Sequence, residues 1–96
     1  MTTKKKSAAD HVIERRGFAE ITLSRPASIE GSEHAVLRMR EPTVEDMAAF
    51  QDDKGSEAVR EISMLANLCE LPPAAIRSLP IRDYARLQAA FALFTN

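Results

Sequence analysis

The sequence predicts one small α+β domain in which an N-terminal antiparallel β-hairpin packs on a small bundle of three to four helices. Apolar and polar residues alternate with period two over residues 18–41, which is typical of half-buried strands. Over residues 43–95, apolar residues recur every three or four positions, which is typical of amphipathic helices. A chain of 96 residues has room for one domain, which we expect to span residues 17–96.

The first 16 residues are polar, show little periodicity and carry five basic and two acidic side chains, a net charge of +3. We therefore expect residues 1–16 to form a basic, disordered tail, with at most a frayed helical turn after Ala8. The remaining 80 residues carry eight basic and twelve acidic side chains. A folded body with that excess of acid repels nucleic acid, so the charge distribution argues against a nucleic-acid partner.

Two strands are expected in the hairpin. Pro26 should end the first strand, because proline cannot donate a hydrogen bond to a neighbouring strand. A loop of about eight residues that contains Gly31 should follow, since glycine and serine there are typical of turns. An isolated two-stranded sheet is marginal in water, so its apolar face must pack on the helices. The alternating apolar positions are Ala19, Ile21 and Leu23 in the first strand and Ala35, Leu37 and Met39 in the second.

The first helix should begin after Thr43, a favourable N-cap residue, and Asp46 lies three positions later as in a capping box. It should end before Gly55, where the composition becomes polar. Its apolar stripe consists of Val44, Met47, Ala48 and Phe50.

Ser56 can cap the second helix, which should end before Pro72. A short helix should open with Pro73, and the last helix should begin near Pro80, because proline is tolerated in a first turn. Asp83 lies in that first turn, where an acid interacts favourably with the helix dipole. Cys69, the single cysteine, lies in an apolar stretch and should be a buried hydrophobic residue.

The last helix ends in a segment, residues 89–94, that is apolar on all sides. Such an end either lies inside the core of its own chain or contacts another chain. Because a body of this size can bury little, we expect a partner or oligomer interface here, with an intramolecular core as the alternative. The candidate interface residues are Tyr84, Leu87, Phe91, Leu93 and Phe94.

Arrangements typical of catalysis or cofactor binding are missing from the sequence. His11 and His34 have no other ligand at metal-binding spacing, and the three glycines are too far apart for a phosphate loop. No serine stands in a nucleophile-elbow context. We therefore expect no enzymatic activity, no catalytic residues, no metal and no cofactor.

No stretch approaches the about 20 apolar residues of a membrane span, and no apolar run of signal-peptide length follows the N-terminus. We therefore expect a soluble cytoplasmic protein. One alternative function is a small DNA-binding regulator, since short helices joined by proline-rich turns resemble a helix-turn-helix. The last helix offers only Arg82, Arg86 and Gln88 for that role. A structural subunit that remains in a particle is a second alternative.

Several segments, taken in order, resemble the small tail assembly chaperones of Mu-like and P2-like phages. The strand that ends at Pro26 and the turn at Gly31 are followed by the segment 40–46, which reads Arg-Glu-Pro-Thr-Val-Glu-Asp and is similar to an Arg-x-Pro-Thr-x-x-Asp pattern of that family. The later segment 65–71 and the spacing of the apolar positions after it are similar as well. The resemblance covers residues 19–94 and depends on the order and spacing of these segments.

The resemblance implies a non-catalytic helper in tail assembly. Members of this family are thought to bind the long, helical tape measure protein and keep it soluble until tail tube subunits polymerise around it. They are commonly made in a short form and in a longer, frameshifted form, and this chain would be the short one. The resemblance further implies that the protein acts in the host cytoplasm and is absent from the mature virion. We also expect a homo-oligomer, because several copies would bind one partner with avidity.

Overall fold

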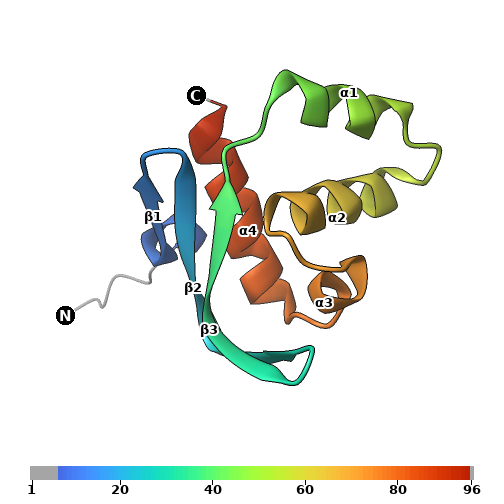
Figure 1. The fold of residues 1–96 in the computed structure, drawn as a ribbon. Coiled ribbons are helices and arrows are strands. Elements are labelled where there is room, and N and C mark those ends of the chain that lie inside the picture. The colour runs from blue at the N-terminus through green and yellow to red at the C-terminus, as the bar shows by residue number, and fades with distance from the viewer. Residues whose placement is uncertain (1–6, 96) are drawn as a thin grey trace.

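The computed structural model describes residues 7–95 and confirms the α+β class, with one strand more than the predicted hairpin. The strands form a sheet of order β1-β2-β3, and the helices follow them in the chain (Figure 1). The elements of the described residues are η1 (Ala8–His11), β1 (Val12–Arg15), β2 (Phe18–Ile29), β3 (Ser32–Arg40), α1 (Val44–Asp52), α2 (Glu57–Leu68), α3 (Pro73–Arg77) and α4 (Ile81–Phe94).

The additional strand comes from the segment predicted to be a disordered tail, and that prediction is wrong for residues 12–15, whereas the turn at Ala8–His11 lies where a helical turn was expected. After a short 3₁₀ turn, β1 pairs antiparallel with β2, from Val12 opposite Ile21 to Arg15 opposite Phe18. Four residues are too few to show a period in the sequence, and this strand exists because β2 offers it a ladder of hydrogen bonds. Residues 1–6 of the predicted tail lie outside the described residues.

The connection from β2 to β3 also differs from the prediction. β2 continues through Pro26 to Ile29, and a two-residue turn replaces the expected eight-residue loop. The turn residues Glu30 and Gly31 have φ angles of 51° and 83°, as the favoured two-residue hairpin turns with two positive φ angles require.

β2 tolerates Pro26 because the ladder is interrupted there. The pairing steps from Thr22 opposite Val36 to Ala27 opposite His34, so residues 23–26 form a bulge. In the bulge, the missing N–H of Pro26 removes no hydrogen bond from the ladder.

Helix α4 supplies hydrogen-bond partners to this part of β2. The fully buried carboxylate of Asp83 accepts hydrogen bonds from the Ser24 backbone N–H at 2.8 Å and from the Ser24 hydroxyl at 3.0 Å. The guanidinium of Arg86 donates to the Thr22 carbonyl oxygen at 2.7 Å. The Ser24 backbone N–H, which the bulge withdraws from the ladder, thus finds a partner on α4, and Asp83 has a tertiary role beyond the predicted interaction with the helix dipole.

The core lies between α4 and the sheet face that carries Ala19, Ile21 and Leu23 (Figure 1). Helices α2 and α3 add the rest of the buried apolar side chains. Cys69 is buried among them as predicted, and burial raises the pKa of its thiol to about 12. Helix α1 stands apart from this core, and Asp46 is the one buried residue of that helix.

Candidate partner-binding groove

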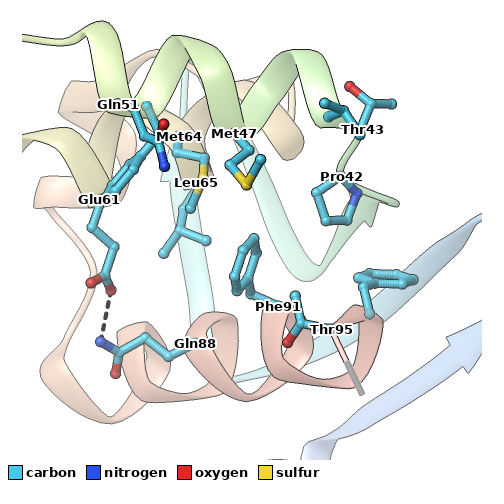
Figure 2. Close-up of a pocket in the computed structure, with 13 residues that line it drawn as sticks. Pro42, Thr43, Met47, Gln51, Glu61, Met64, Leu65, Gln88, Phe91 and Thr95 are labelled. Carbon is cyan, nitrogen blue, oxygen red and sulfur yellow. Dashed lines mark hydrogen bonds between the residues drawn. The ribbon is translucent and has the colours of Figure 1, made fainter.

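An apolar groove of about 620 Å³ lies between α1, α2 and the C-terminal end of α4. Figure 2 shows Met47 of α1 and Phe91 of α4 pointing into it from opposite sides. Its apolar lining consists of Pro42, Val44, Met47, Phe50, Met64, Leu65, Phe91 and Phe94.

The first wall of the groove, α1, begins at the predicted capping box. The Thr43 hydroxyl oxygen accepts a hydrogen bond from the Asp46 backbone N–H at 3.3 Å, and the Asp46 carboxylate accepts one from the Thr43 backbone N–H at 2.8 Å. Both residues thereby satisfy N–H groups that a helix start leaves without partners.

The Asp46 carboxylate also attaches α1 to the rest of the molecule. It accepts two hydrogen bonds from the Arg40 guanidinium of β3, at 2.7 and 2.9 Å, and one from the Asn67 amide of α2 at 3.3 Å. Two parallel N–H···O bonds between arginine and carboxylate are among the stronger polar contacts in proteins. The segment 40–46 that resembles the family pattern therefore holds the groove wall in place.

These contacts change the acidity of both partners. The hydrogen bonds from Arg40 hold the pKa of the Asp46 carboxyl far below its ordinary value, with Thr43 contributing in the same direction and burial opposing it. The same ion pair raises the pKa of Arg40. The carboxyl group is therefore ionised throughout the neutral range.

This shift predicts a loss of stability in acid. Because the pKa of Asp46 is lower in the folded state, its contribution is fully present above the unfolded value of about 3.9 and is lost as the pH falls below it. The destabilisation caused by Asp46→Asn, measured by urea unfolding, should shrink between about pH 5 and pH 2.5. In an Arg40→Met background, this pH dependence should weaken, because Arg40 is the largest cause of the shift. An equal pH dependence in both backgrounds would contradict this assignment.

The apolar stripe of α1 lies largely open at the groove. Val44 is 77% exposed and Met47 is 52% exposed. The sequence indicated that these residues share one helix face, but no local signal showed that this face lacks a cover inside the chain. Large apolar side chains grouped at the rim of a groove are typical of an interaction site.

The structure separates the predicted interface residues. Phe91 and Phe94 are half-buried and line the groove together with Met47. Leu87 is fully buried in the core. Leu93 is half-buried outside the groove lining.

Tyr84, the remaining predicted residue, lies next to the polar end of the groove. Its hydroxyl group donates to the Glu61 carboxylate at 2.8 Å, and burial raises the pKa of the phenol, with Glu61 adding to the effect. The Gln88 amide donates to the same Glu61 oxygen at 2.7 Å (Figure 2). Among the described residues, Glu61 is the one charged side chain in the groove lining.

Within residues 7–95, no group of three or more His, Cys, Asp or Glu side chains is arranged to hold a metal ion. Over the same part of the chain, every helix is too short or too polar to cross a membrane.

A family model described as "Phage tail assembly chaperone proteins, E, or 41 or 14" matches residues 20–96. The match includes all three walls of the groove and the segment 40–46. No curated protein and no solved structure matches the chain.

Proposed function

This chain belongs to the family of phage tail assembly chaperones, and we propose that it binds the tape measure protein and keeps it soluble while the tail tube is assembled. The observation that carries this proposal is the apolar groove, whose exposed Met47 and Val44 have no cover within the described chain. A long helical protein that exposes an apolar stripe would aggregate without such a surface to bind it.

The shape and composition of the groove suit a helix. Amphipathic helices bind in apolar grooves through side chains at positions i, i+3, i+4 and i+7. Methionine side chains adapt to different partners, and the groove has Met47 on α1 and Met64 on α2. A chaperone that must hold many segments of one long protein benefits from such adaptable contacts.

The length of the groove suggests that several copies act together. Its α1 wall extends from Thr43 to Gln51, eight steps of about 1.5 Å each, or about 12 Å. One copy therefore covers about two turns of a bound helix, and many copies are needed along a long one. We therefore propose that several copies bind one tape measure protein. We also propose that they are absent from the finished particle, as the resemblance to the chaperones of Mu-like and P2-like phages implies.

The proposed role consists of binding and release, with no covalent bond made or broken. We place this role in the cytoplasm.

The alternative of a DNA-binding regulator would need a basic helical surface. Residues 41–61, which form α1 and the first half of α2, carry seven acidic and two basic side chains. That surface would repel the DNA backbone.

Met47→Asp should abolish the chaperone function without unfolding the protein. The substitution places a carboxylate in the groove, where a bound apolar helix would remove it from water at a cost of several kcal/mol. On co-expression with the tape measure protein of the same phage, the soluble fraction of that protein should fall at least about fivefold. Because Met47 is half-exposed, thermal unfolding of the variant should shift little.

Ile81→Asp is the matched control. Ile81 is 84% exposed and lies outside the groove at the start of α4, so the same change of chemistry should leave the soluble fraction unchanged. A folded Met47→Asp protein that still keeps its partner soluble would refute the proposed function, as would an equal loss in the two variants.

A further inference from the structure

We infer that the groove selects a helix whose apolar face is flanked by basic side chains. The identity of that helix as part of the tape measure protein rests on the proposed function, whereas the selection by charge follows from the groove itself.

The acidic side chains of the chain are concentrated in the segment that forms α1 and the start of α2. Residues 41–61 carry a net charge of −5, whereas residues 1–40 carry +3 and residues 62–96 carry +1. One of the three groove walls, α1, comes from this acidic segment, as does Glu61 of the α2 wall. Because Glu61 lies in an otherwise apolar lining, its charge acts on whatever helix binds there.

The acidic charge at the end of the groove has a defined position. Glu61 accepts hydrogen bonds from Gln88 and Tyr84, which hold its carboxylate between α2 and α4. Glu57 lies one turn earlier on α2, and positions i and i+4 share a helix face, so it extends the acidic surface beyond the apolar lining. A lysine or arginine next to the apolar face of a bound helix would form a charge-assisted hydrogen bond here.

The same charge argues against a second copy of this chain as the occupant. The exposed apolar helix that a second copy could offer is α1, with Val44 and Met47. That helix carries the exposed acids Glu45 and Asp52 and no basic side chain, so two copies docked through this face would bring like charges together. Like charges across an interface oppose association. The complementary occupant is a basic amphipathic helix of another protein.

Two synthetic helical peptides of about 20 residues test this inference. They carry the same Leu and Met residues at i, i+3, i+4 and i+7 and differ in the flanking positions, which are Lys in one and Glu in the other. Fluorescence anisotropy measures their binding to the full chain. At low salt, the Lys peptide should bind about tenfold more tightly than the Glu peptide, and the ratio should decrease as salt screens the charges.

Variants that remove acidic side chains test whether the preference for the Lys peptide comes from the groove. Glu57→Gln with Glu61→Gln should reduce the ratio to about twofold or less, and the amide introduced at position 61 keeps a carbonyl oxygen that can still accept from Tyr84 and Gln88. Glu14→Gln with Glu33→Gln removes the same charge from exposed sheet positions and should leave the ratio near tenfold. Met47→Asp should abolish the binding of both peptides.

Equal affinities for the two peptides would overturn the inference, as would a ratio that survives the loss of Glu57 and Glu61. Binding of neither peptide, together with a dimer in sedimentation that Met47→Asp disrupts, would overturn it by assigning the groove to a second copy. A preserved Lys preference in a protein that fails to keep the tape measure protein soluble would refute the proposed function and support the charge selection.

Discussion

Asp83→Ala should lower the free energy of unfolding by about 3 kcal/mol, because it removes a buried carboxylate that satisfies the β2 bulge. Without it, the Ser24 backbone N–H and hydroxyl lose their acceptors, and Arg86 loses an acidic neighbour at 3.9 Å. A loss of this size is a large part of the roughly 5–15 kcal/mol typical of small domains. Urea unfolding followed by far-UV circular dichroism measures it.

Two milder variants separate the contributions. Asp83→Asn keeps one acceptor oxygen for the Ser24 N–H and should cost about half as much as the alanine variant. Ser24→Ala removes only the hydroxyl hydrogen bond and should cost about 1 kcal/mol. If Asp83→Ala proves no more damaging than Ser24→Ala, contacts other than those with α4 hold the bulge.

Asp46→Ala should cost about 2–3 kcal/mol and release α1 from the body of the protein. The substitution removes the helix cap contact to Thr43, the two hydrogen bonds from Arg40 and the one from Asn67. Because Asp46 is the one buried residue of α1, the loss of its contacts leaves mainly the half-buried Phe50, which lies against Arg60, to position the helix. Amide hydrogen exchange should therefore accelerate at least about tenfold in α1 while the sheet stays protected.

Glu45→Ala is the control for this variant, since Glu45 is an exposed acid in the same first turn of α1. It should change the free energy of unfolding by no more than about 0.5 kcal/mol. If the groove wall is correctly assigned, Asp46→Ala should also weaken binding of the Lys peptide, because α1 then no longer faces α4. Unchanged exchange in α1 would show that other contacts position this helix.

Local signals in the sequence predicted most of the elements. The spacing of apolar residues indicated the helices, Thr43 and Ser56 marked two helix starts, and Pro72 marked a helix end. The apolar end of α4 led to Phe91 and Phe94, both of which line the groove. These signals are readable because caps, breakers and period depend on residues within a few positions of one another.

Signals that depend on distant residues were misread or absent. Pro26 indicates a strand end in isolation, yet β2 passes through it because Asp83, 59 positions away from Ser24, satisfies the bulge. Likewise, β1 is too short to be recognised without the strand that pairs with it. Leu87 and Phe91 belong to the same apolar helix, but one is in the core and the other in the groove.

The sequence by itself determined the α+β class, the order of the hairpin and helices, the capping of α1 and the concentration of acid in residues 41–61. Only the tertiary structure decided which apolar faces are covered and which remain open at the groove between α1, α2 and α4. The physical reason is that periodicity establishes which side chains share a face, whereas the neighbour that buries a face comes from elsewhere in the chain.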